Sequence, residues 1–398
     1  MPLAREAEVV VIGGGVHGAS AAYHLARERR HVVLIEKRTI ASASSGASGG
    51  IIRCHYSNPA MVRLAHRAAE RWPGLAEELG APVDYVNNGL IVAVTGASDA
   101  AHLERVVRMQ QRAGVATQVI APEEIRAWIP EFATEGLTLA AREADAGYAD
   151  PYSASMAFAA KARTLGAQVY TETLVTGITV IGSRVTGVET DRGAIRTSTV
   201  VNCAGAWAAR IAAMAGIDLP VSPGLLQMVA FQPAYEGWTR QSPTWLDLST
   251  MTYCRPDASG AMLAGGGVAE NAAINVTDVD PDAVPPRPPV EFEAEIHENV
   301  VRRCPWASRS ARLRAWSGPD GNSPDFHLIF GPVPGLAGYL QIVGGSGNSF
   351  KLAPATGEAL AEYVTTGTST YLDPHAFSVT RFVDGRPFRG GYQMHIIG

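Results

Sequence analysis

The segment from Glu8 to Glu36 constrains the fold more than any other part of the chain. It reads EVVVIGGGVHGASAAYHLARERRHVVLIE. Its two short, unbroken apolar runs, at residues 9–12 and 32–35, are typical of parallel strands that are covered on both faces. The alanine-rich stretch between them predicts a helix with a face of small side chains. The segment therefore predicts a β-α-β unit.

Three glycines between the first strand and the helix carry the chemical signal. Gly13 suits a tight turn, Gly15 lets a pyrophosphate approach the backbone, and Gly18 allows close packing of the helix on the strand. Glu36 ends the second strand, where its carboxylate can accept from ribose hydroxyls and would repel a 2′-phosphate. We therefore expect a bound dinucleotide, which this segment alone does not identify as NAD or FAD.

The rest of the chain does not continue as regular β-α-β repeats, which disfavours a nicotinamide-dependent dehydrogenase domain. VVNCAGAW, residues 200–207, reads as a buried strand that ends in a turn of small residues, where the backbone can approach the cofactor a second time. Helices are expected at 59–79, 100–113, 153–165 and 290–303, and strands at 90–94, 167–170, 175–181, 185–190, 194–197, 226–231 and 262–264.

Composition excludes several classes of function. A chain of 398 residues with 46% hydrophobic and 18% charged residues is globular and large enough for two packed domains. The formal net charge of −5, without runs of like charge, argues against nucleic-acid and membrane-surface partners. No signal peptide or membrane-spanning run is evident, and the dispersed cysteines suit no metal, so we expect a cytoplasmic protein with reduced thiols.

The order of the motifs resembles the FAD-dependent D-amino-acid oxidase superfamily, specifically its sarcosine oxidase and glycine oxidase branch. The resemblance rests on VVVIGGGVHGASAAYHLA, SSGASGGIIR, DAGYADP, VVNCAGAW, SPDFHLIFG and GGSGNSFK, which span nearly the whole chain. It implies an α/β and α+β fold, with a Rossmann-like FAD-binding domain interleaved with a substrate domain on a largely antiparallel sheet. The FAD-binding domain would comprise residues 1–85, 145–220 and 310–398, and the substrate-binding domain 86–144 and 221–309.

The resemblance also implies that FAD is bound without a covalent link. The flavin-linking cysteine of monomeric sarcosine oxidases would lie near Gly318, where this chain has no cysteine. Mostly small residues would contact the cofactor through backbone amides, which bulky side chains would obstruct. The expected cofactor-binding residues are Gly13, Gly15, Val16, His17, Gly18, Glu36, Lys37, Ser44, Ser45, Gly46, Gly49, Gly50, Ile51, Val175, Ala204, Gly205, Trp207, Gly318, Gly344, Gly345, Ser346, Gly347, Asn348, Ser349 and Lys351.

Two cations match the carboxylate-binding residues of sarcosine oxidase-like proteins. Arg53 follows the stretch SASSGASGGII, and Lys351 ends GGSGNSFK as a lysine ends the similar GFSGHGFK motif. Two cations in a partly dry pocket bind an anion better than either does in water. Tyr253 and Met262 complete the expected substrate-binding set, and Met262 stands where sarcosine oxidases carry a lysine that helps oxygen to react.

The resemblance implies oxidation of a carboxylate-bearing amine. A neutral amine would transfer a hydride from its α-carbon to the flavin, and the resulting imine would then hydrolyse. No catalytic acid or base of the protein is needed for this reaction. Gly345 and Gly266 stand where sarcosine oxidases carry phenylalanine and histidine, and Asp320 stands where glycine oxidases carry an arginine. We expect added space for an N-substituted glycine or related secondary amino acid, giving glyoxylate and an amine, with O2 reduced to H2O2.

Two alternatives remain open at this point. One is an FAD-dependent dehydrogenase of a D-amino acid or a 2-hydroxy acid that uses another electron acceptor. The other is a flavin-binding regulatory or structural subunit without turnover, against which the presence of both Arg53 and Lys351 argues. The expected partners are small molecules, an amino-acid substrate and O2, and the oligomeric state is left open.

Overall fold

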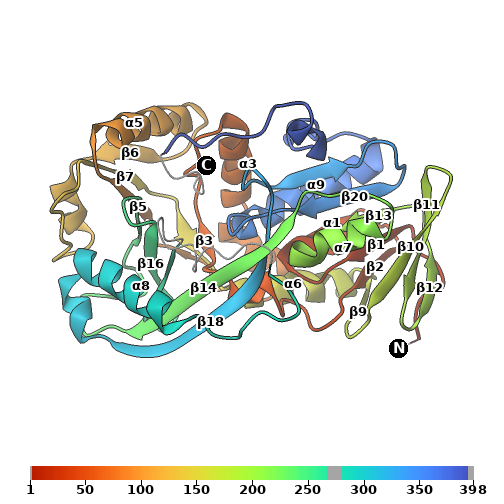
Figure 1. Cartoon of the computed structure of the whole chain (residues 1–398), viewed down its shortest axis with the longest axis horizontal. Helices are drawn as coiled ribbons and strands as arrows, with labels where there is room; N and C mark the ends of the chain where they lie inside the picture. Colours follow the sequence, from red (N-terminus) through yellow and green to blue (C-terminus); the bar gives the residue numbers. More distant parts are fainter. Residues whose placement is uncertain (1, 267–278, 393–398) are drawn as a thin grey trace.

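A computed structural model describes residues 2–266 and 279–392. Its elements form two units that lie side by side along the long axis, each built around its own large sheet (Figure 1). The first unit contains a six-stranded sheet in the order β19-β20-β13-β1-β2-β9. Its strands are β1 Val9–Ile12, β2 Val32–Ile35, β9 Gln168–Tyr170, β13 Val200–Asn202, β19 Ile329–Pro332 and β20 Tyr339–Val343.

The six-stranded sheet is parallel except at its β19 edge. Strand β1 pairs in parallel with β2 and β13, and all residues of β1 and β2 are buried. These two strands have the bounds that the sequence predicted. A strand covered on both faces must be apolar at every position, so an unbroken apolar run marks both of its ends. A three-stranded sheet packs against one face, with β10 Val175–Ile181, β11 Arg184–Thr190 and β12 Gly193–Arg196.

Three helices cover the other face of the six-stranded sheet. They are α1 Val16–Arg27, α6 Pro151–Thr164 and α9 Ala353–Thr366, which share one apolar core with α3 Pro59–Ala69 and α4 Leu75–Leu79. The sequence predicted one helix over 59–79. The structure divides it at a short turn, Trp72–Gly74, because Pro73 cannot continue an α-helical hydrogen-bond ladder.

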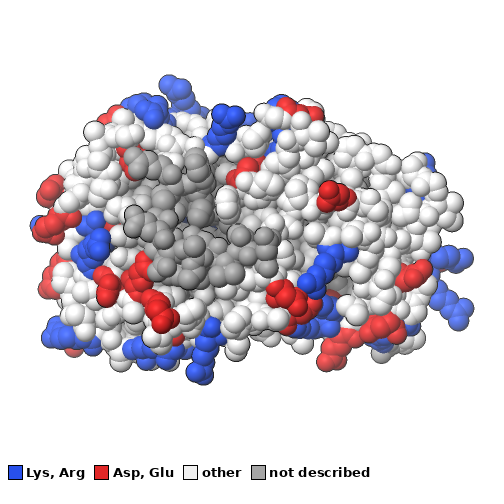
Figure 2. Space-filling model, in the orientation of Figure 1, with Lys and Arg blue, Asp and Glu red and all other residues white. Residues whose placement is uncertain are grey.

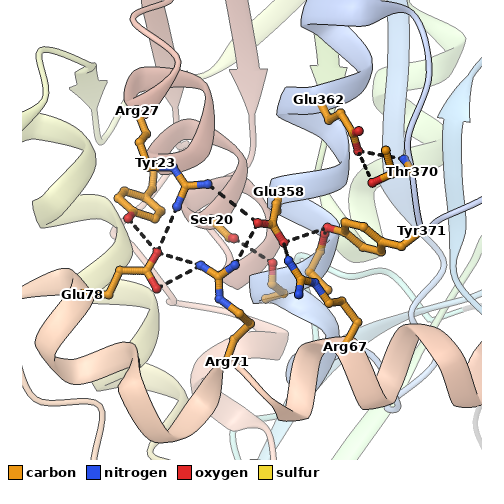
Figure 3. A network of polar contacts seen from close by, with 12 residues as sticks. Ser20, Tyr23, Arg27, Arg67, Arg71, Glu78, Glu358, Glu362, Thr370 and Tyr371 are labelled. Atoms are coloured by element: carbon orange, nitrogen blue, oxygen red, sulfur yellow. Dashed lines mark hydrogen bonds and ion pairs between the residues drawn. The ribbon is translucent and has the colours of Figure 1, made fainter. Parts of the chain in front are cut away.

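A network of polar and charged side chains joins these helices (Figure 3). Glu78 accepts from Arg71 at 2.9 Å and from Tyr23 at 2.8 Å, and Glu358 accepts from Arg71 at 2.8 Å and from Arg67 at 3.1 Å. The network thereby links α1, α3, α4 and α9. It holds α9, which begins at Ala353, two residues after the predicted substrate-binding residue Lys351.

The second unit contains an eight-stranded, mostly antiparallel sheet in the order β18-β14-β17-β16-β15-β5-β7-β6. Helix α8, Val290–Arg303, covers one face with Phe292, Ile296 and Val300, and α5, Ala97–Arg112, packs against the β5 side. The strands are β5 Leu90–Val94, β6 Thr117–Ile120, β7 Leu139–Glu143, β14 Ser222–Gln232, β15 Thr244–Asp247, β16 Thr252–Pro256, β17 Met262–Gly266 and β18 Ala311–Asn322.

Strand β18 lies in a different unit from the one to which the sequence-based domain assignment gave it. Residues 310–398 were expected in the FAD-binding domain, but β18 pairs with β14 from Gln232↔Ala311 to Ser222↔Asn322. This ladder places residues 311–322 in the eight-stranded sheet, and the other domain limits remain a prediction. A small sheet, β3 Ile51–Ile52, β8 Gly147–Tyr148 and β4 Val86–Asn87, lies between the two large ones along the chain.

The charges on the described surface agree with the sequence, which has no runs of like charge. Lys, Arg, Asp and Glu are interspersed over the described part of the face in Figure 2, without an extended patch of one sign. Among the described residues, no helix is long and apolar enough to cross a membrane.

Candidate functional site

A cavity lies where the parallel strands β1, β2 and β13 end. The carboxyl ends of parallel strands meet at one edge of a sheet, so the turns that follow them face a common space. Leu226, Asp320 and Gly321 of the eight-stranded sheet also contribute to the wall. The expected cofactor-binding residues that line the cavity are Gly13, Gly15, Val16, His17, Glu36, Lys37, Ser44, Ser45, Val175, Ala204, Gly205, Trp207, Gly344, Gly345, Gly347 and Ser349.

The three glycines of the first turn have the different environments that their expected roles require. A Cβ on Gly13 would lie 2.4 Å from the Cys203 carbonyl oxygen, and one on Gly18 would lie 1.9 Å from the Gly13 carbonyl oxygen. A Cβ on Gly15 would meet only Ser45 Oγ, at 3.0 Å, on the cavity wall. Gly13 and Gly18 thus permit close packing, whereas Gly15 leaves the start of α1 open to a phosphate group.

Glu36 is held at the cavity in an orientation that suits ribose recognition. Its Oε2 accepts from the Gly14 amide at 2.6 Å, and its Oε1 accepts from the Arg38 amide at 2.7 Å. A carboxylate has further lone pairs, which remain for ribose hydroxyls. The wall runs from Glu36 and Lys37 to Gly345 and Asp320. The residues present therefore fit a dinucleotide along the whole cavity.

Several other expected cofactor-binding residues are glycines at which a neighbouring segment packs closely against the backbone. A Cβ would lie 2.3 Å from the Ala41 carbonyl oxygen at Gly46, 2.3 Å from the Ala149 carbonyl oxygen at Gly50, and 2.6 Å from Ala47 Cβ at Gly318. The stretch around them forms a short helix, α2 Ser44–Ala47, which sits against β18. The expected residues outside the cavity wall are Gly18, Gly46, Gly49, Gly50, Ile51, Gly318, Ser346, Asn348 and Lys351.

The two expected carboxylate-binding cations meet at one aromatic ring. Arg53 Cζ lies 4.7 Å, and Lys351 Nζ lies 5.1 Å, from the centre of the Tyr56 ring. Arg53 NH2 donates to Asn348 Oδ1 at 3.1 Å. Lys351 Nζ and the Tyr56 hydroxyl both donate to the Asn348 carbonyl oxygen, at 2.6 Å and 2.9 Å. The structure thus brings together two cations that lie far apart in sequence, and adds Tyr56, which no motif singled out.

Both cations are buried without an acidic ion-pair partner in the described part of the chain. Arg53 is 6% and Lys351 is 5% exposed. The buried ion pairs that do form are elsewhere, between Arg303 and Asp247 and between Arg381 and Asp325. Burial lowers the pKa of Lys351 well below its ordinary value, and the charge of Arg53 lowers it further. An anion bound beside them would stabilise the charged form of Lys351.

No local motif points to Glu143, yet the structure places its side chain close to the cations. Its Oε1 accepts from the Cys54 amide at 2.7 Å, and its Oε2 is buried without a hydrogen-bond partner among the described residues. Burial raises the pKa of Glu143 to about 7, against the opposing effects of the Cys54 hydrogen bond and of Arg53 and Lys351. The pairing of β7 with β5 brings Glu143 here, a long-range effect that spacing along the sequence does not reveal.

Tyr253 and Met262 lie on opposite faces of the eight-stranded sheet. A Cβ on Gly49 would lie 3.0 Å from the Tyr253 hydroxyl, so Tyr253 faces the unit of the six-stranded sheet. Met262 is packed in the core beneath α8, and this placement contradicts the expectation that it binds substrate. Successive strand residues point to opposite faces, so the residue that faces the unit of the six-stranded sheet is Leu263, beside Met228 and Tyr253.

The extra space expected at Gly266 and Gly345 is not present around the described atoms. A Cβ on Gly266 would lie 2.4 Å from the Met251 carbonyl oxygen. A Cβ on Gly345 would lie 2.0 Å from Ser349 Oγ and 2.7 Å from Ser349 Cβ. Each glycine allows a neighbouring segment to approach closely instead of opening a pocket. The two positions therefore give no support for a larger nitrogen substituent.

The sheet, its glycine turn and the cavity at the strand ends together define the site of a dinucleotide-binding protein. Residues 8–363 match the model of the FAD dependent oxidoreductase family. The chain therefore belongs to that family, and its cofactor is FAD.

Relatives of the chain include enzymes that act on amino acids. Human mitochondrial sarcosine dehydrogenase is 28% identical, in an alignment that covers 96% of this chain and 42% of that protein. Sarcosine oxidase subunit beta of Rhodobacter capsulatus is 25% identical, with 95% and 90% covered. The chain spans less than half the length of the mammalian relatives that it matches.

Solved structures show the same fold over nearly the whole chain. L-proline dehydrogenase from P. horikoshii has a TM-score of 0.90 and 31% identity, covering 97% of this chain and 100% of that chain. Glycine oxidase from Geobacillus kaustophilus has a TM-score of 0.84 and 25% identity, covering 95% and 99%. These similarities confirm the expected family and the expected mixed α/β architecture.

Proposed function

We propose that the chain oxidises a secondary amino acid, such as an N-substituted glycine, at its carbon–nitrogen bond. The observation that carries this proposal is the pair of buried cations, Arg53 and Lys351, which no carboxylate of the described residues pairs with. A substrate carboxylate beside them would supply the missing negative charge. The names of relatives that act on sarcosine and L-proline support the same class of substrate.

In this proposal the protein orients the substrate, and bound FAD accepts the hydride from its α-carbon. Arg53 and Lys351 hold the carboxylate. The Tyr56 ring contacts both cations, and its hydroxyl donates to the Asn348 carbonyl oxygen, which also accepts from Lys351. Water adds to the imine product, which divides into glyoxylate and a primary amine when the substrate is an N-substituted glycine. No cysteine lies near Gly318, where monomeric sarcosine oxidases carry the cysteine that links the flavin, so in this proposal the FAD is bound without that covalent link.

We take O2 as the electron acceptor, so that each oxidised substrate yields one H2O2. A dehydrogenase that passes its electrons to another acceptor is the second candidate. Strand β17 favours that candidate, because it contains no lysine and presents the apolar Leu263 toward the FAD-binding unit. Release of peroxide when the substrate-reduced protein meets air would support O2, and turnover with an added dye but not with air would support the dehydrogenase.

The test is anaerobic mixing of the holoprotein with a substrate panel while the flavin absorbance is followed. We expect sarcosine, a bulkier N-alkyl glycine or L-proline to bleach the flavin, and the matching amines without a carboxylate to leave it oxidised. Faster bleaching by D-alanine or a 2-hydroxy acid would replace the proposal by the alternative substrate classes. No bleaching at all would favour a regulatory role, as named for a mouse relative, the pyruvate dehydrogenase phosphatase regulatory subunit, which is 25% identical.

A further inference from the structure

A loop of the eight-stranded-sheet unit reaches one end of the FAD cavity. The loop leads into α8, and its described part begins at residue 279. In Figure 1 this teal segment extends from α8 toward the FAD-binding unit, where α7, Ala208–Ala213, lies. Asp282 of the loop lines the cavity together with Lys37, Trp207 and Arg210 of the FAD-binding unit. The wall at this end is therefore shared between the two units.

The Asp282 carboxylate joins three donors on two segments, the one that follows β2 and the one that runs from residue 205 to α7. Its Oδ1 accepts from Lys37 Nζ at 2.5 Å. Its Oδ2 accepts from Arg210 NH1 at 2.9 Å and from Trp207 Nε1 at 3.1 Å. Lys37 Nζ also lies 3.7 Å from the centre of the Trp207 ring, a cation–π contact. We call Asp282, Lys37, Trp207 and Arg210 the Asp282 cluster. Removal of the Asp282 carboxylate would take one contact from each of the other three residues.

The electrostatics of the Asp282 cluster favour an ionised carboxylate. Partial burial raises the pKa of Asp282, but hydrogen bonds from Lys37 and Trp207 and the charge of Arg210 outweigh that effect and lower the pKa. The Asp282 side chain is 42% exposed, so salt can reach the cluster and screen its charges. The cluster should therefore weaken as the ionic strength rises.

The position of the Asp282 cluster suggests what it does. Lys37 follows Glu36, whose carboxylate faces the part of the cavity expected to hold a ribose. Trp207 follows Gly205, where the backbone approaches the cavity for the second time. The cluster thus stands at the nucleotide end of the site. A loop fastened there covers the cofactor, and a loop released there uncovers it.

We propose that Asp282 is a cofactor-positioning residue, which fastens the loop before α8 across the nucleotide end of the FAD cavity and so slows the release of FAD. The same contacts hold the ammonium of Lys37 and the ring of Trp207 in the cavity wall. The proposal concerns retention of FAD and does not depend on the identity of the substrate.

The test compares FAD release from Asp282→Asn and Asp280→Asn holoproteins. Asp280 is a matched control, because it lies in the same loop and accepts from Arg210 NH2 at 2.8 Å but does not line the cavity. Release is followed by the fluorescence of free FAD after dilution. We expect Asp282→Asn to release FAD about tenfold faster than the unmodified protein, as the loss of a charge-assisted contact predicts, and Asp280→Asn within about threefold.

Salt dependence gives a second readout that a general loss of folding would not produce. Between about 0.05 M and about 0.5 M NaCl, release from the unmodified protein should accelerate, whereas release from Asp282→Asn should change little.

Lys37→Gln should also speed the release of FAD, and the Asp282→Asn/Lys37→Gln double variant should release FAD no faster than the faster single variant. Equal release rates and equal salt responses in Asp282→Asn and the unmodified protein would overturn the proposal, as would additive effects in the double variant.

Discussion

The two ends of the candidate site are constructed in different ways. The proposed FAD cavity is shaped by backbone and small side chains, and at Gly13 and Gly18 even a methyl group would overlap a carbonyl oxygen. The proposed substrate end is made of buried charges, with Arg53 and Lys351 held on Tyr56. The first end depends on shape and the second on charge. Substitutions at the two ends should therefore fail for different physical reasons.

The difference also separates stability from function. Close packing at the glycine turn stabilises the fold whether or not FAD is bound. The buried cations have the opposite property, because burial lowers the pKa of Lys351 and raises that of Glu143, so ionisation of either group is costly without a ligand. Buried ionisable groups at this site therefore lower the stability of the free protein and favour the binding of an anion.

The largest effect should follow from Gly18→Ala. Its Cβ would lie 1.9 Å from the Gly13 carbonyl oxygen, so α1 would have to move away from β1. We expect a loss of folding free energy of more than about 3 kcal/mol, seen as little folded protein and little bound FAD in circular dichroism and absorbance. Gly15→Ala is the matched control, because its Cβ would meet only Ser45 Oγ at 3.0 Å. That variant should fold and bind FAD more weakly, and a normal FAD content in Gly18→Ala would contradict this account.

The second prediction concerns ligand binding at the charged end. Arg53→Met and Lys351→Met should each weaken binding of a carboxylate ligand by about 10- to 100-fold, because one charge-assisted contact is worth roughly 1.5–3 kcal/mol. The measurement is titration of the flavin spectrum with an unreactive carboxylate, together with kcat/KM for the best substrate. FAD content should be unchanged, and the exposed Arg196→Met should behave as the unmodified protein. Unchanged ligand binding in both buried variants would remove the carboxylate site.

The sequence predicted the cofactor end far better than the substrate end. Strands 9–12 and 32–35 and the glycines between them are consecutive, so local spacing sets their positions in the cavity. Glu143 approaches Arg53 only through the pairing of β7 with β5, which no local pattern encodes. The contact of buried Arg255 with the Gly49 carbonyl arises in the same way, across the boundary of the two units.

The sequence-based errors have physical causes of the same kind. Met262 lies on the core face of β17, because a difference of one residue in a strand alignment reverses the face to which a side chain points. Gly266 was expected to open space, but the neighbouring backbone at Met251 occupies it. A glycine in a sequence signals either a vacancy or a close approach, and only the surrounding chain decides between them.

A third prediction concerns the stability cost of the charged end. The pKa of Glu143 is raised from 4.5 to about 7, so between these values the folded protein keeps a proton that the unfolded chain has released. Stability should therefore fall as the pH rises through this window and level off above it. The total loss is about 3.5 kcal/mol, at about 1.4 kcal/mol for each pKa unit. Glu143→Gln can still accept from the Cys54 amide and should lack this loss.

Urea unfolding at pH 5 and pH 8 measures the effect at Glu143. The difference in unfolding free energy between Glu143→Gln and the unmodified protein should shift in favour of the variant at the higher pH. The exposed Glu123→Gln should show no such shift. A stability difference for Glu143→Gln that is the same at both pH values would show that the Glu143 carboxyl carries no electrostatic cost.

The smallest effect should come from Tyr392→Phe, which tests how firmly the charged end is supported. The Tyr392 hydroxyl lies 2.7 Å from His55 Nε2, and the His55 carbonyl accepts from Arg53. Gln110 Nε2 lies 3.3 Å from His55 Nδ1, so loss of the hydroxyl leaves Nε2 of a buried ring without its partner. If this support orients Arg53, the KM for the carboxylate substrate should rise by about three- to tenfold, equivalent to about 0.7–1.4 kcal/mol, while kcat stays nearly constant. Tyr371→Phe removes another tyrosine hydroxyl, which donates to the Ala355 carbonyl and to Glu358, and should leave KM unchanged. A fall in kcat without a change in KM would mean that Tyr392 does not act through the carboxylate anchor.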